Sequence, residues 1–255
     1  MKLVPAILLS LLTSAAAFGA TIGAAAADIT VTVSATKDAM IFGTSANADT
    51  GNASGKGPAL FAGADGSSNR KRSTIVFDIA SAGIPSNATI VSATMTMYLA
   101  QVAGSGGGGG GSYPNRVLKL HKVQQTWGEG SSGSPTSPTV GGTGGGYTRV
   151  SGDSSWTYAL YSGTSWTAGG NINATSSASS TFSTPFVLNQ AYTWSSAGLV
   201  TDVGSWVSGA TTNNGWLVKS DLETSPTSFL GYWSRDGAAA NSNPAIAPKL
   251  TIVYR

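Results

Sequence analysis

Apolar and polar residues alternate along many short stretches of this chain, and no other feature of the sequence constrains the fold as strongly. Apolar residues occupy every second position in residues 29–34 and 93–99, with Thr, Ser or Tyr between them. A period of two residues is the pattern of a strand that buries one face. Clusters of Gly, Pro, Asn and Ser bound these stretches, which is typical of a β-sandwich or a β-barrel.

The same kind of pattern predicts further strands at residues 75–79, 116–123, 184–189, 215–220, 228–234 and 249–255. One segment differs, because residues 198–209 place Leu199, Val203 and Trp206 three or four positions apart, which predicts a short helical segment across the sheet. The side chains expected to point into the core include Ile75, Phe77, Met95, Met97, Leu250 and Ile252.

The beginning of the chain has the order of a secretory signal peptide: Lys2, an apolar run to Leu12, then small residues up to Ala27. Cleavage fits after Ala20 or after Ala27, and we prefer Ala27 because the first strand pattern starts directly after it. The apolar run is shorter than the about 18 residues that a membrane span needs. We therefore expect residues 1–27 to be a signal peptide and the protein to be secreted, extracellular or at the cell surface, with no membrane span.

Residues 28–255 have the length of one large all-β domain. The absence of Cys excludes disulfides and thiolate chemistry. A charged fraction of 10% and a net charge of +3 argue against nucleic acid, which demands a basic stripe. The Gly-rich stretches 103–112 and 131–146 are expected to be loop insertions, and neither has the Lys-Ser/Thr ending of a phosphate-binding loop.

Several motifs occur in a characteristic order, among them "ATKDAMIF", "GPALFAG", "VQQTWGEG", "YWSRDGA" and "APKLTIVY". Together they resemble the DNRLRE domain, a disaggregatase-related β-sandwich that is similar to carbohydrate-binding module family 96. The resemblance covers essentially all of residues 28–255. It implies a two-sheet antiparallel β-sandwich of jelly-roll-like form, and it implies a module that accompanies enzymes acting on acidic polysaccharides or belongs to cell-surface proteins.

The chain offers few candidates for catalysis or metal binding. His121 is the single histidine and lies in no HExxH or GxSxG frame, and Glu129 has no second carboxylate near it in sequence, so we predict no catalytic residue. Asp38, Asp49 and Asp65 carry oxygen donors that suit calcium, although Asp beside Gly is also common in turns. No cofactor is required, and a structural calcium ion stays open as an alternative.

Arg235 is expected at the end of the strand 228–234. A guanidinium there can donate two parallel hydrogen bonds to a carboxylate or to loop carbonyl oxygens. The family resemblance favours this structural clamp over a ligand contact. Asp78 and Asp202 are the predicted partners.

Aromatic and basic residues supply the candidate ligand contacts. Trp156 and Tyr161 lie in a loop-rich segment where we expect exposure, and aromatic faces stack on sugar rings. Arg116, Lys119 and His121 lie on a basic strand and would favour uronate or sulfate, although a solvated strand edge explains such charges equally well.

The sequence therefore predicts a secreted, non-catalytic, carbohydrate-binding protein that binds acidic polysaccharide at the cell surface or in extracellular matrix. A structural subunit of an extracellular filament or coat, assembled with other copies through strand edges, is the first alternative. A polysaccharide lyase or hydrolase is the second.

Overall fold

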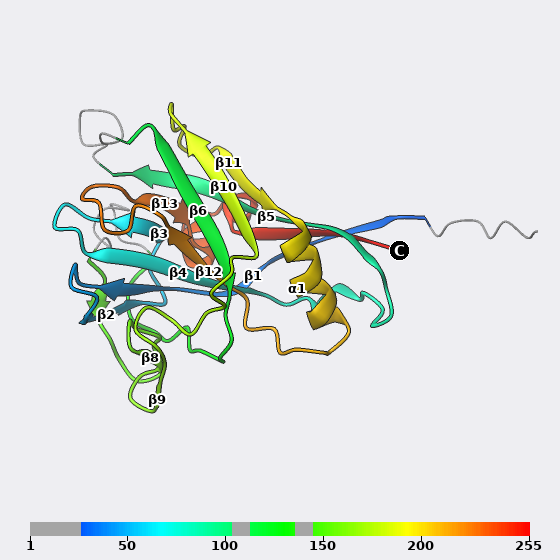
Figure 1. Cartoon of the computed structure of the whole chain (residues 1–255), viewed down its shortest axis with the longest axis horizontal. Helices are drawn as coiled ribbons and strands as arrows, with labels where there is room; N and C mark the ends of the chain where they lie inside the picture. Colours follow the sequence, from blue (N-terminus) through cyan, green and yellow to red (C-terminus); the bar gives the residue numbers. More distant parts are fainter. Residues whose placement is uncertain (1–26, 104–112, 136–144) are drawn as a thin grey trace, which may run out of the picture.

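A computed structural model of the chain describes residues 27–103, 113–135 and 145–255 (Figure 1). Nearly all of the predicted signal peptide and most of the two Gly-rich stretches lie outside these ranges. Within them, no helix has both the length and the apolar character that crossing a membrane requires.

Strands are by far the commonest regular structure in the described residues, so the all-β prediction is confirmed (Figure 1). Two short α-helices accompany them, α1 (Ala197–Val207) and α2 (Arg235–Ala240), with 3-10 turns at Ala80–Ala82 (η1) and Pro244–Ile246 (η3). The strands are β1 (Ile29–Gly43), β2 (Asp49–Ser54), β3 (Ala59–Ala64), β4 (Arg70–Phe77), β5 (Ile90–Val102), β6 (Asn115–Lys122), β7 (Tyr147–Thr148), β8 (Tyr158–Leu160), β9 (Thr164–Ser165), β10 (Ala178–Ser183), β11 (Ala191–Ser195), β12 (Trp216–Ser220), β13 (Leu230–Trp233) and β14 (Lys249–Tyr254).

Antiparallel pairing joins the described strands into one path, apart from the small β8–β9 hairpin. The path runs β10-β6-β12-β4-β3-β13-β5-β14-β1-β2-β7, with β11 added beside β5. A further pairing of β4 with β1 closes six of the strands, β4, β3, β13, β5, β14 and β1, into a ring. Hydrogen bonding therefore does not divide the strands into two separate sheets.

The long strand β1 makes this closure possible. Its residues 29–34 pair with β14, and its residues 35–43 then pair with β4, with a register shift between Ala35 and Lys37. The expected strands at residues 29–34 and 249–254 are thus both present and lie side by side. One strand serves two sets of partners in succession, which alternation in the sequence alone does not reveal.

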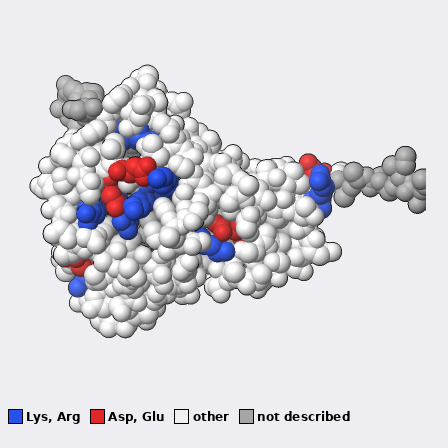
Figure 2. Space-filling model, in the orientation of Figure 1, with Lys and Arg blue, Asp and Glu red and all other residues white. Residues whose placement is uncertain are grey.

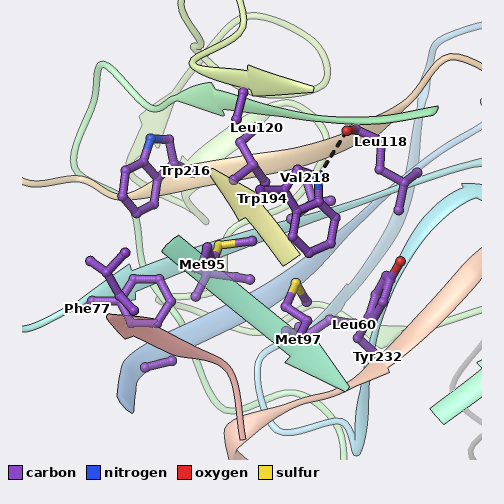
Figure 3. Packing of buried hydrophobic residues seen from close by; sticks show 14 of the residues in the cluster. Leu60, Phe77, Met95, Met97, Leu118, Leu120, Trp194, Trp216, Val218 and Tyr232 are labelled. Carbon is purple, nitrogen blue, oxygen red and sulfur yellow. Dashed lines mark hydrogen bonds between the residues drawn. The ribbon is translucent and has the colours of Figure 1, made fainter. Parts of the chain in front are cut away.

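The main core lies inside the ring and under its added strands (Figure 3). Met95 of β5 lies between Leu250 of β14 and Trp194 of β11 in register. The indole Nε1 of Trp194 donates a hydrogen bond of 3.0 Å to the carbonyl oxygen of Leu118. The predicted inward side chains are confirmed as fully buried, namely Ile75, Phe77, Met95, Met97, Leu250 and Ile252.

The predicted helical segment is confirmed as α1. Ser196 caps it by accepting a hydrogen bond from the backbone N–H of Leu199, and the apolar spacing buries Leu199, Val203 and Trp206 against the strands. The predicted strand at residues 184–189 is wrong, because this segment is the connection between β10 and β11. It contains Pro185, and it ends in Asn189 with a left-handed φ of 62°.

A second, smaller apolar cluster lies on the face of β1 and β12 that points away from the main core. Its members are Ala39, Ile41, Val123, Trp127, Trp156, Ala159, Trp166 and Leu217. Residues 155–172 contribute much of it, so this loop-rich segment packs onto the strand face and carries the β8–β9 hairpin with it (Figure 1).

Trp216 joins the core to α1. Its ring centre lies 4.6 Å from that of Trp206, and its Nε1 donates to the Asp202 carboxylate at 2.8 Å. We expect Trp216→Ala to lower the free energy of unfolding by about 3–5 kcal/mol, because it leaves a cavity in the core. Denaturant unfolding measures this loss, with the half-buried Trp233→Ala as the matched control. Equal losses for the two variants would contradict the assigned core.

Candidate functional site

Arg235 lies at the start of α2 and not in a strand end. Ser234 caps this helix with its hydroxyl, which accepts from the backbone N–H of Gly237, so the Arg235 side chain leaves the first turn toward residues 128–130. Its Nη2 lies 2.7 Å from Glu129 Oε1 and 3.1 Å from Asp236 Oδ2. Arg235 therefore contacts carboxylates as the clamp prediction requires.

The predicted partners of Arg235 are wrong, because Asp78 and Asp202 have other roles. Asp78 accepts a hydrogen bond from the backbone N–H of Ser81 at the turn η1. Asp202, on α1, accepts from the indole of Trp216 and from the hydroxyl of Ser177. Neither side chain reaches the Arg235 cluster.

A buried carboxyl group lies beneath Arg235. Asp38 is 1% exposed, and it accepts a hydrogen bond of 2.8 Å from the Arg235 backbone N–H, while its own backbone N–H donates to Glu129. Desolvation is the main cause that raises the pKa of Asp38 to about 7; the hydrogen bond from Arg235 opposes this shift and the charge of Glu129 adds to it. Lys56 completes the cluster, with its Nζ 3.3 Å from Glu129 and 3.6 Å from Asp236.

This cluster is the one place in the described residues where three possible metal-binding side chains meet, namely Asp38, Glu129 and Asp236. Arg235 and Lys56 already pair with Glu129 and Asp236. The geometry thus describes an ionic clamp that joins β1, the 128–130 loop and α2.

The structure does not bring the predicted calcium ligands Asp38, Asp49 and Asp65 together. Asp49 pairs with Arg149 and accepts from Thr157, whereas Asp65 pairs with Lys71 and accepts from the backbone N–H groups of its own turn. Hydrogen bonds from their neighbours hold the pKa values of Asp49 and Asp65 below the usual range, against desolvation, which is the largest single influence. A calcium site stays a prediction of the sequence.

The buried Asp38 carboxyl makes stability depend on pH. Its pKa in the folded state is about 7, above the ordinary 3.8, so the folded protein holds this proton between the two values and the unfolded chain does not. The stabilising effect of the proton is full below about pH 4 and is lost as the pH rises to about 7. We expect Asp38→Asn to flatten the fall in melting temperature across this window. An unchanged pH profile in the variant would contradict the assignment.

The clamp also predicts the effect of removing Arg235. We expect Arg235→Ala to lower the melting temperature, because Glu129 and Asp236 then lose a cationic partner next to the buried Asp38. The control is Arg255→Ala, since Arg255 forms a half-exposed pair with Asp28 that contributes little. If Arg235→Ala weakened polysaccharide binding but kept its melting temperature, the structural role would be wrong.

Two of the predicted sugar contacts, Arg116 and Trp156, are fully buried, so the prediction that they face a ligand is wrong. Arg116 points inward with Leu118 and Leu120, and its Nε donates to the carbonyl oxygen of Ser228 at 2.8 Å. Trp156 is fully buried in the second apolar cluster, and the guanidinium of Arg72 lies 4.7 Å from its ring centre. Both side chains hold the interior together.

His121 and Tyr161 have different surroundings. His121 is 7% exposed, and its Nδ1 lies 2.9 Å from the carbonyl oxygen of Asn173. Burial is the main cause that lowers the pKa of His121, so the ring is neutral at physiological pH. Tyr161 is half-buried in contact with Tyr158 and with Arg149, whose guanidinium lies 4.3 Å from the Tyr161 ring centre. The five predicted contacts therefore do not form one site.

Lys119, like Tyr161, is partly exposed at the surface. It lies directly opposite Lys219 of β12 in register, and about one third of each side chain is exposed. Lys119 pairs with Asp221 at 2.8 Å, and Lys219 lies 3.6 Å from Glu223. We call Arg72, Lys119, Lys219, Asp221 and Glu223 the charged face.

Arg72 fixes the acidic part of the charged face. Its Nε and Nη2 bind both oxygens of Glu223, at 2.8 and 2.6 Å. Three cations thus face two carboxylates, which leaves one excess positive charge. Figure 2 shows positive and negative groups side by side in small mixed patches, within a wide surface of uncharged residues.

A groove of about 700 Å³ lies at the end of β6. The loop after β6, the β8–β9 hairpin and the loop after α1 form its walls. Amide and hydroxyl side chains dominate its lining, which consists of Lys122, Val123, Gln124, Gln125, Thr126, Leu160, Thr164, Asn173, Thr211, Thr212 and Asn214. No pattern in the sequence indicates this groove, because its three walls are far apart along the chain.

Neither the protein-family models nor the curated proteins compared with this chain give a match. The resemblance to the DNRLRE domain therefore stays a prediction. The motifs behind it do converge in space, since Asp38 of "ATKDAMIF", Glu129 of "VQQTWGEG" and Arg235 of "YWSRDGA" meet in the ionic clamp. Gly57 of "GPALFAG" joins them by accepting a hydrogen bond from Ser234. Residues from these four motifs thus meet in one structural cluster.

Proposed function

We propose that this protein is an exported, non-catalytic domain that binds an acidic polysaccharide outside the cell. The observation that carries the proposal is the charged face, where Lys119 and Lys219 stand side by side with one excess positive charge around them. A uronate or sulfate group can contact both ammonium groups there. The jelly-roll-like sandwich implied by the DNRLRE resemblance and the predicted signal peptide belong to the same proposal.

The energetics of such a face favour a polymer over a single sugar. Each exposed ion pair contributes at most about 1 kcal/mol, and Asp221 and Glu223 compete for the same lysines. Affinity for one sugar is therefore low, and repetition of the charge along a chain raises the overall affinity.

The proposal predicts a salt-sensitive interaction that depends on Lys119 and Lys219. We expect alginate- or pectate-like polymers to retard the protein in native gels more than neutral glucans do, and less at high salt, because the screening length is only about 8 Å near physiological ionic strength. Lys119→Gln with Lys219→Gln should weaken this retardation several-fold. Lys249→Gln is the matched control, since Lys249 lies on β14 beside Tyr98, away from the charged face.

Two results would contradict the charge argument. One is equal retardation by neutral and acidic polymers, and the other is retardation that salt does not change. Either result would leave contacts with uncharged parts of the sugar as the mechanism.

One observation favours a second candidate function, a subunit of an extracellular filament or coat. Residues 29–34 of β1 pair with β14 on one side, and none of the described strands pairs with them on the other. This edge contains neither Lys nor Pro, the residues that usually protect an edge strand from pairing with another chain. Size in solution discriminates the two functions, because a filament subunit forms a ladder of large assemblies and a binding domain stays a monomer.

A further inference from the structure

The groove at the end of β6 has walls that are tied together by hydrogen bonds. Gln125 Nε2 donates to the carbonyl oxygen of Ser165 at 3.0 Å, which fixes the β8–β9 hairpin to the loop after β6. On the other wall, Thr126 Oγ1 donates to Asn214 Oδ1 at 3.2 Å, and Trp127 Nε1 donates to the Asn214 carbonyl oxygen at 2.9 Å. The groove is therefore preformed, which lowers the entropy cost of binding a ligand.

The single charge in the groove lining is already compensated. Lys122 Nζ lies 2.9 Å from Ser205 Oγ, 3.0 Å from Thr211 Oγ1 and 3.5 Å from an Asp202 carboxylate oxygen. A ligand in the groove thus meets no excess charge. This environment differs from the charged face, where one positive charge is in excess.

Four exposed polar side chains in the lining make no side-chain hydrogen bond to any other residue in the described ranges: Gln124, Thr164, Asn173 and Thr212. Their backbones are nevertheless held, since the Asn173 N–H donates to Lys122 O and the Gln124 N–H donates to Asn171 O, both at 2.9 Å. Leu160 adds an apolar side chain that is 36% exposed. The groove thus presents free amides and hydroxyls beside one apolar surface.

We propose that this groove is a binding site for uncharged sugar units of a neutral polysaccharide. A side-chain amide has a donor and an acceptor, so Gln124 and Asn173 can each bind neighbouring hydroxyl groups of a sugar ring. Thr164 and Thr212 add hydroxyl contacts, and Leu160 packs against the apolar C–H face of the ring. The volume of about 700 Å³ lies within the roughly 300–1,000 Å³ of small-molecule sites.

This inference goes beyond the proposed function and does not depend on it. The charged face selects polymers by charge, whereas the groove excludes a carboxylate or sulfate because no free cation is present to compensate it. The two sites therefore predict different ligands and different sensitivity to salt.

The test is native gel electrophoresis of the full protein in gels containing a neutral β-1,3-glucan, α-1,4-glucan, galactomannan or arabinoxylan. We expect at least one of these polymers to retard the protein, with little change at high salt. Gln124→Ala with Asn173→Ala should weaken that affinity roughly 30-fold, since two hydrogen bonds of about 1 kcal/mol each are lost and every 1.4 kcal/mol is about a factor of ten. Leu160→Ala is an independent second variant that should also weaken it.

The matched control is Gln190→Ala with Asn87→Ala, which removes the same two side-chain types from exposed positions outside the groove. It should keep wild-type affinity, and Lys119→Gln with Lys219→Gln should keep it as well. Absence of retardation by all four neutral polymers would overturn the proposal. So would unchanged affinity in the double variant at an unchanged melting temperature, whatever the acidic polymers do.

Discussion

The ionic contact between Arg235 and Glu129 joins parts of the chain that are far apart in sequence. Glu129 accepts from the guanidinium of Arg235 and from the backbone N–H of Asp38, and Asp38 in turn accepts from the backbone N–H of Arg235. β1, the 128–130 loop and α2 are thereby fixed to one another near the point where β1 changes partners from β14 to β4. The loop after β6 also begins the groove, so the same contact helps to place the candidate binding surface.

The two candidate binding surfaces arise from different physical sources. The charged face follows from strand pairing, because the register of β6 with β12 places Lys119 opposite Lys219. The groove follows from connections that are tied by hydrogen bonds, and its walls have no regular secondary structure apart from the β8–β9 hairpin and the end of β6. A charge pattern on strands gives selectivity at long range, while fixed amides and hydroxyls give selectivity at contact distance.

Local periodicity explains which features the sequence predicted. Alternation identified β1 and β14, and a three-to-four spacing identified α1, because each pattern depends only on neighbouring residues. The same alternation places Arg116 on the inward side with Leu118 and Leu120, although its charge alone suggests a position at the surface. Trp156 offered no such clue, since the segment that packs onto the strand face has no regular period.

Contacts between distant segments lay beyond the sequence. Arg235 and Glu129 are 106 residues apart, so Asp78 and Asp202 were equally reasonable partners. Lys219 faces Lys119 only because β6 and β12 pair, and nothing in either strand specifies that neighbour. The all-β class could be predicted, whereas the closed ring depends on one strand with two sets of partners.

The position of β14 has a consequence for how the protein folds. β14 follows every other strand in sequence, yet it lies between β1, the first strand, and β5. The pairing of β14 with β1 cannot form until both ends of the described chain have come together, and the pairing of β14 with β5 also joins strands far apart in sequence, so the contact order is high. Domains dominated by such non-local pairings fold slowly, in milliseconds to seconds. Until β14 has been synthesised, the edges of β1 and β5 with which it pairs have no strand beside them.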